Sequence, residues 1–303
     1  MKFNRMMEIT MRQAKPHAAP QGEPARAGIT SGGSPLRIGT VALTVRDLDR
    51  VSRFYQDIIG LRLIEADARG HRLGAGDRVL LDLRHDPRAQ LSDRHQAGLF
   101  HTAFLLPDRA ALADWLIHAA GQRAALDGAS DHLVSEALYL TDPEGNGIEI
   151  YRDRDSADWT IVPDGTVAMA TLRLDLDDLA AAGTGKPFAG MPGGTIVGHV
   201  HLQVGDLDPA EAFYAGALGF EVMTRYNGAN FFGSDGYHHH IGTNIWNSRG
   251  AGPRPEGNTG LAEVELLATP GVAAGIASRL GEADSGEIAA RDPWGTRLTI
   301  RTV

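Results

Sequence analysis

The most constraining feature of this sequence is an internal repeat, because repeated segments indicate repeated structural units. The stretch GTVALTVRDLDRVSRFYQDIIGL, which starts at Gly39, returns as GHVHLQVGDLDPAEAFYAGALGF from Gly198. A second pair, DPEGNGIEIY from Asp142 and DPWGTRLTIR from Asp292, ends both halves in the same way. The chain is therefore predicted to contain two tandem halves, residues 36–155 and 195–303.

Each half is itself predicted to hold two units of the form βαβββ, called modules below. Residues 41–45 alternate as a strand does, and Asp47 or Asp49 can cap the helix that follows. The same strand-then-helix pattern begins again at residue 98. The modules of the second half are expected at about residues 198–246 and 260–301. The predicted fold class is therefore α+β, with four βαβββ modules.

Two segments outside the modules lack such patterns. Residues 1–35 are rich in Pro, Gly and Ser without apolar periodicity, which is typical of a disordered leader. Residues 156–194 are expected to form a linker between the halves, with one short strand around 168–174.

Composition excludes several classes of function. The net charge of −9, with no cluster of Lys and Arg, argues against a nucleic-acid partner. No stretch approaches the roughly 18 apolar residues of a membrane span, so a cytoplasmic location is expected. The chain has no cysteine, so any metal must be held by His, Asp or Glu.

Four βαβββ modules, of which the first and third open with G-[HT]-V-x-L-x-V and carry a Phe-Tyr pair, resemble the vicinal-oxygen-chelate superfamily, which includes glyoxalase I, fosfomycin-resistance proteins and extradiol dioxygenases. The resemblance covers nearly everything after residue 36. It implies that paired modules form two cupped mixed-sheet barrels, whose strands aim side chains at one metal ion.

The resemblance also places candidate ligands. They are Thr40 in the first module, His101 and Glu149 in the second, His199 and His239 in the third, and Glu263 and Thr299 in the fourth. Pairing of modules within each half would leave both sites incomplete. Pairing of the second module with the third would bring His101, Glu149 and His199 together, and the first and fourth modules would form a metal-free structural pair. Two imidazoles and one carboxylate are the facial triad of non-haem Fe(II), and Mn(II) suits the same ligands.

One segment points to ring cleavage in particular. In DHLVSEALYLTDPEGNGIE, the residues His132, Tyr139 and Glu149 and the intervening Asp-Pro turn resemble the extradiol dioxygenase signature, apart from Ser130 at its first position. His132 and Tyr139 resemble the residues that bond the substrate hydroxyls. His239, in GYHHHIGTN, resembles the acid/base histidine on a strand of these enzymes. The chain also resembles bacterial catechol-2,3-dioxygenases of the CatE kind.

The resemblance therefore implies an oxidoreductase that uses Fe(II) and O2 to open a catechol-like diol in aromatic hydrocarbon catabolism, with a homodimer as a common assembly. Two alternatives stay open. A glyoxalase-like isomerase or lyase would use similar ligands but usually two carboxylates, and a binding protein would hold a small ligand without turnover. The three histidines at 238–240 could also be a surface metal scavenger, and an isolated strand histidine is often structural.

Overall fold

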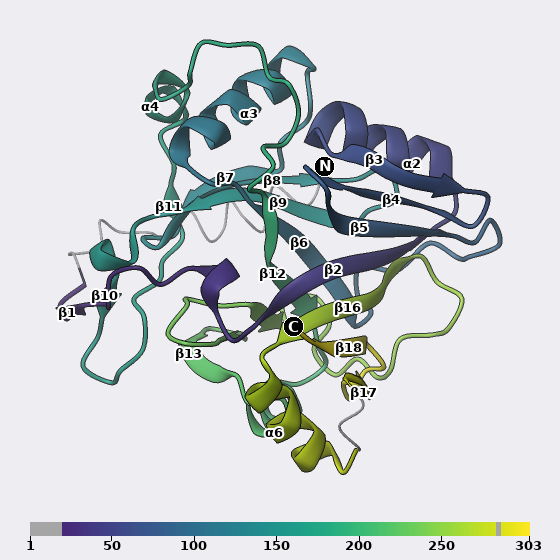
Figure 1. The fold of residues 1–303 in the computed structure, drawn as a ribbon, viewed down its shortest axis with the longest axis vertical. Helices are drawn as coiled ribbons and strands as arrows, with labels where there is room; N and C mark the ends of the chain where they lie inside the picture. Colours follow the sequence, from purple (N-terminus) through teal and green to yellow (C-terminus); the bar gives the residue numbers. More distant parts are fainter. Residues whose placement is uncertain (1–19, 283–285) are drawn as a thin grey trace.

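Two large mixed sheets make up most of the fold in a computed structural model that describes residues 20–282 and 286–303 (Figure 1). The first sheet has nine strands in the order β11 (Leu172–Arg173), β7 (Gly128–Asp131), β8 (Ser135–Thr141), β9 (Gly147–Asp153), β6 (Gly98–Leu105), β12 (Ile196–Gln203), β15 (Ile241–Asn244), β14 (Ala229–Gly233) and β13 (Glu221–Tyr226). The second has seven, in the order β17 (Glu287–Arg291), β18 (Arg297–Thr302), β16 (Gly260–Ala268), β2 (Leu36–Val45), β5 (Arg78–His85), β4 (Gly70–Ala75) and β3 (Arg62–Asp67).

Helices cover the outer faces of these sheets. They are α2 (Leu48–Phe54), which continues as the π turn η2 (Tyr55–Ile59), α3 (Arg109–Gly121), α4 (Leu176–Ala181), α5 (Leu207–Glu211), which continues as the π turn η4 (Ala212–Ala217), and α6 (Pro270–Leu280). The first Asp of each Asp-Leu-Asp repeat is the helix N-cap. The carboxylate of Asp47 accepts from the backbone of Arg50, and that of Asp206 accepts from the backbone of Asp208.

Each sheet combines one module from each half of the sequence. In the nine-stranded sheet, β6 of the second module runs antiparallel to β12 of the third. In the seven-stranded sheet, β2 of the first module pairs in the same way with β16 of the fourth. The α+β class and its paired modules are therefore confirmed, and pairing within halves is excluded. The fourth module is shorter than expected, with two described strands after its helix, because only residues 281–286 separate α6 from β17.

The Phe-Tyr repeat links the modules of each half across the sheets. The hydroxyl of the buried Tyr55 donates to Asp142, in the turn between β8 and β9, at 3.4 Å. Tyr214 donates to Asp292 of the fourth module at 3.0 Å. Each tyrosine thus joins the module that carries it to the next module in the chain, which lies in the other sheet.

The expected disorder of the leader is wrong for residues 20–35, whereas residues 1–19 lie outside the described part of the chain. Within 20–35 lie β1 (Glu23–Pro24), which pairs with β10 (Thr160–Ile161), and the 3-10 turn η1 (Ser31–Gly33). The Ser31 hydroxyl donates to the carbonyl of Gly198 at 3.0 Å. Such contacts satisfy buried backbone groups of another module, which local composition does not reveal.

The linker has structure of its own. It contains the 3-10 turn η3 (Ser156–Asp158), α4 and β11, and β11 is the expected short strand, added to the edge of the nine-stranded sheet. Among the described residues, no helix has the length and apolar character needed to cross a bilayer. The cytoplasmic location stays a prediction.

Candidate metal centre

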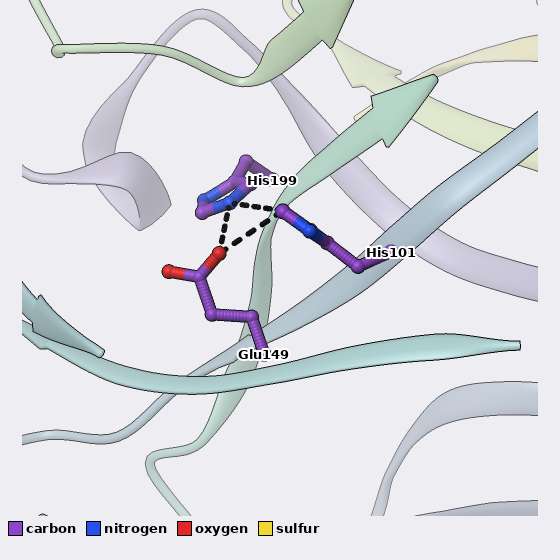
Figure 2. Close-up of side chains that lie close together, drawn as sticks. All are labelled: His101, Glu149 and His199. Carbon is purple, nitrogen blue, oxygen red and sulfur yellow. Dashed lines mark hydrogen bonds and ion pairs between the residues drawn. The ribbon is translucent and has the colours of Figure 1, made fainter. Parts of the chain in front are cut away.

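Three ligand side chains converge from three neighbouring strands of the nine-stranded sheet. Glu149 lies on β9, His101 on the adjacent β6 and His199 on β12, and Figure 2 shows the three pointing toward one another. The Nε2 atoms of His101 and His199 lie 3.0 and 3.1 Å from Glu149 Oε2. The two Nε2 atoms lie 3.3 Å apart. Three donor atoms therefore meet at one point, as the pairing of the second and third modules predicts.

Strand register produces this convergence. Ala103 on β6 lies opposite Glu149 on the parallel strand β9 and opposite His199 on the antiparallel strand β12. Since side chains alternate along a strand, His101 projects from the same face as Ala103, two residues away. The side chain of Ala103 is completely buried, and by register it lies between those of Glu149 and His199 on this face.

The electrostatics suit a cation. Burial alone would raise the pKa of the Glu149 carboxyl, but its interactions with the imidazoles of His199 and His101 outweigh burial and hold this pKa well below its usual range. Burial also lowers the pKa of His199, which keeps its ring neutral and its lone pair available. Ligands of an octahedral ion at about 2.1 Å lie about 3 Å from one another. The spacing of the three donor atoms therefore fits a divalent metal ion.

Tyr139 and His132 form a bonded pair beside these ligands. Tyr139 on β8 lies directly opposite Glu149, and its ring centroid is 5.7 Å from that of His101. His132 Nδ1 lies 2.7 Å from the carbonyl of Ala170 and therefore carries a proton, which leaves Nε2 to accept from the Tyr139 hydroxyl at 2.7 Å. Burial, followed by the charge of Glu149, raises the pKa of Tyr139 well above its usual value, so the phenol stays protonated.

His239 reaches the site from a loop and not from the strand that was expected. Residues 234–240 precede β15 and turn through Asp235 and Gly236, whose φ angles are 55° and 79°. The ring centroid of His239 lies 4.1 Å from that of His199. Alternation along a strand therefore cannot decide which of the three histidines faces the ligands, and the loop geometry does.

The other two histidines of the triplet are also buried, so a surface metal scavenger is excluded. His240 faces the carbonyl of Ser31 at 3.4 Å, and burial lowers its pKa to about 3. His238 lies between His239 and Asp153, and this pair of contacts was not predicted from the sequence. The alternation that aims Glu149 into the cup also places Tyr151 and Asp153 on the same face of β9, and this periodicity was the available signal.

His201 also faces the cup, opposite His101 in the register of β6 and β12. Asn244 Oδ1 accepts from the backbone N–H of Trp246 at 3.2 Å, so its amide nitrogen donates to His201 Nε2 at 3.0 Å. Burial lowers the pKa of His201 well below its usual value. This imidazole is therefore a neutral side chain bonded within the protein, set among the rings of Phe100, Phe231 and Trp246.

The corresponding residues of the seven-stranded sheet are arranged differently. Arg84 Nε lies 2.9 Å from Asp82, and Nη1 of the same guanidinium lies 2.9 Å from Glu263. The Thr299 hydroxyl donates to Glu263 at 2.6 Å, while that of Thr40 donates to a backbone carbonyl at 3.3 Å. The guanidinium of Arg84 thus neutralises the carboxylates of Asp82 and Glu263. The described residues contain one group of three potential metal ligands, and it lies in the other sheet.

The fold and this cluster together define a class of protein in which paired βαβββ modules carry a metal-ligand set on a cupped sheet. The model of the Glyoxalase/Bleomycin resistance protein/Dioxygenase superfamily matches residues 37–150 and 196–300. The chain belongs to this superfamily.

Individual relatives agree with the assignment. The chain is 43% identical over 237 residues to a protein of Bacillus subtilis (strain 168) named Catechol-2,3-dioxygenase, covering 77% of this chain and 83% of the relative. Glyoxalase I from Zea mays aligns with a TM-score of 0.52 at 15% identity, over 90% of this chain and 94% of its own. A putative dioxygenase from Bacillus subtilis aligns with a TM-score of 0.53 at 15% identity, over 88% and 85%. The two solved structures share the fold, and the first relative supports a dioxygenase-like enzyme.

Proposed function

We propose that this protein is an extradiol dioxygenase that uses Fe(II) and O2 to open the ring of a catechol-like diol. The observation that carries the proposal is the convergence of His101, His199 and Glu149 beside the bonded pair of His132 and Tyr139. A glyoxalase-like site would usually offer a second carboxylate, whereas histidine and tyrosine surround the single glutamate here. The name of the 43% identical relative supports the same reaction class.

His101, Glu149 and His199 would hold the ion, with Fe(II) as the proposed metal and Mn(II) compatible with the same ligands. When bound, the ion supplies a Lewis acid and the one-electron chemistry that lets a diol react with O2. The carboxylate contributes one negative charge to the site, whereas imidazoles bind metal ions in their neutral form and contribute none. One of the two positive charges of the ion would thus stay uncompensated, which favours binding of an ionised diol.

The surrounding residues would manage protons and position the ring. His239 is neutral, because burial and then the neighbouring histidines lower its pKa well below the usual value, so it can accept a proton from a diol hydroxyl. The Tyr139 hydroxyl donates to His132 and keeps its oxygen free to accept from the second diol hydroxyl. In the overall reaction, the ring bond beside one hydroxyl breaks and both atoms of O2 enter the product.

The test is oxygen uptake and visible absorbance with catechol and 4-methylcatechol, after anaerobic purification and loading with Fe(II). The variants are Glu149→Gln and, as a matched control, Glu263→Gln in the seven-stranded sheet. We expect wild type and the control to bind iron, consume oxygen and form a yellow ring-opened product, and Glu149→Gln to lose both iron and turnover. Full activity of Glu149→Gln would refute the assigned site. Iron binding without oxygen uptake on any diol would point to an isomerase or a binding protein.

We further propose that the protein assembles as a homodimer. Sedimentation equilibrium of the iron-loaded protein would measure it.

A further inference from the structure

A hydrogen-bonded chain leads from Asp153, at the end of β9, to His239. The Asp153 carboxylate lies 2.8 Å from His238 Nε2, and His238 Nδ1 lies 2.8 Å from His239 Nδ1. Asp153 also accepts from the Tyr237 hydroxyl at 3.0 Å. His238 is completely buried, so its ring nitrogens depend on these protein partners.

The order of groups in this chain decides which nitrogen carries each proton. An ionised carboxylate only accepts, so Nε2 of His238 must donate to Asp153. A neutral imidazole that donates from one nitrogen accepts at the other, so a neutral His238 takes a hydrogen bond at Nδ1 from the Nδ1–H of His239. Nε2 of His239 is consequently left with a lone pair.

We infer that Asp153 and His238 are positioning residues that hold His239 in the Nδ1–H tautomer, with Nε2 available to accept a proton from the bound diol. The inference rests on the proposed function, because it explains how the proposed base acquires the correct tautomer. In serine proteases, an aspartate orients the catalytic histidine in a similar way, and its exchange for asparagine lowers turnover about 10⁴-fold through the wrong tautomer.

Other contacts of His239 do not distinguish between its tautomers. Its ring lies 4.1 Å from the ring of His199 and 4.9 Å from that of Phe231, and both contacts hold the plane of the imidazole without selecting a proton position. The chain through His238 is therefore the structural element that makes the two nitrogens different.

The same network touches the strand that carries a metal ligand. The Tyr151 hydroxyl lies 2.9 Å from the Tyr237 hydroxyl, and the Tyr151 ring centroid lies 4.8 Å from that of His199. Gly198 on β12 leaves room for this hydroxyl, because a Cβ atom there would collide with it. The positioning network and the metal ligands thus belong to one packed unit.

The experiment measures tautomers directly, on metal-free protein labelled with ¹⁵N in its histidines. Correlation spectra distinguish protonated from unprotonated ring nitrogens, and loss of signals in His239→Gln assigns those of His239. The test variants are Asp153→Asn, whose amide can donate to His238 and reverse the chain, and His238→Phe, which removes the acceptor. His238→Asn is the rescue variant, since its side-chain oxygen can stand where Nδ1 stood. Tyr237→Phe is the control, because Asp153 keeps His238 as a partner.

We expect His239 to be the Nδ1–H tautomer in wild type, Tyr237→Phe and His238→Asn, and to change in Asp153→Asn and His238→Phe. With iron and diol, Asp153→Asn should lose at least about 100-fold in kcat with little change in KM, as loss of a tautomer-setting residue implies. An Nε2–H tautomer in wild type, or the same tautomer in every variant, would overturn the inference. Absence of turnover by iron-loaded wild type would refute the proposed function instead, and the spectra would still decide the tautomer.

Discussion

Replacement of Glu136 by glutamine tests how the second module holds its strands together. Glu136 lies on the face of β8 opposite Tyr139, buried beneath three arginines. Its carboxylate lies 2.8 Å from Arg109 Nε, 2.6 Å from Arg152 Nη2 and 3.4 Å from Arg154 Nη2. These contacts join α3, β8 and β9, the last of which carries Glu149.

The expected loss in the free energy of unfolding depends on which acidic partners each arginine keeps after the substitution. Arg109 retains Asp178 and Arg154 retains Asp131, and their side chains are 30% and 31% exposed, so water screens their loss. Arg152 is only 13% exposed and loses its carboxylate partner. Breaking a buried ion pair costs about 3–5 kcal/mol, and partial exposure reduces this figure. We therefore expect Glu136→Gln to lower the free energy of unfolding by about 2–3 kcal/mol.

The assay is urea unfolding at pH 7 and at lower pH, with Glu65→Gln as the control. Glu65 pairs with Arg72 on the surface, where both side chains are about half exposed, so its loss should cost less than about 0.5 kcal/mol. Burial would raise the pKa of Glu136, but its hydrogen bonds to Arg109 and Arg152 outweigh it and lower this pKa.

The pKa of the Glu136 carboxyl is lower in the folded state than in the unfolded state. Its contribution to the free energy of unfolding is therefore complete above a pH of about 4.5 and is lost as the pH falls through the folded-state pKa. The difference between wild type and Glu136→Gln should therefore shrink in acid. A difference below about 0.5 kcal/mol at pH 7 would contradict the role assigned to Glu136, since it would equal that of an exposed pair.

Three further predictions concern the metal centre and its packing. Ala103→Val should weaken metal binding at least about 10-fold in calorimetry while circular dichroism stays native, because added methyl groups enter the space among the ligands; unchanged affinity would contradict the crowded site. Divalent metal should raise the melting temperature of wild type but not of Glu149→Gln, since an ion that binds only the folded protein stabilises it; equal shifts would place the ion elsewhere. Gly198→Ala should cost about 1–3 kcal/mol by collision with Tyr151, whereas Gly271→Ala, which meets open space, should not destabilise; equal melting temperatures would contradict that contact.

Much of the fold was predictable from the sequence because the repeat marks the same structural positions four times. The pairing of the second and third modules was predictable because only this pairing collects His101, Glu149 and His199 at one point. The parts of the structure that the sequence did not predict depend on interactions between distant segments. Residues 20–35 are ordered by backbone carbonyls of other modules, as in the contact from Ser31 to Gly198, and no local pattern announces such a contact.

The surroundings of the site were only partly predictable for a similar reason. His239 could be placed by its resemblance to a motif, but it lies in a loop before β15, where the alternation of a strand does not apply. His239 is linked to Asp153 through His238, and His238 lies 85 positions from Asp153 in the sequence. Periodicity can place Asp153 on the cup face of β9, but it cannot identify the imidazole that meets it.

Because each sheet combines one module from each half of the sequence, the two sheets differ in when they can fold during synthesis. The second and third modules follow each other, so the sheet with the metal ligands can assemble before residues 260–303 exist. Strand β2 is made first, yet its partner β16 comes more than 200 residues later, as the pairing of Thr44 with Gly260 shows. Such long separations slow folding and leave an unpaired edge exposed in the meantime. A nascent chain could thus complete the sheet that carries the candidate metal ligands while β2 of its first module is not yet paired with β16.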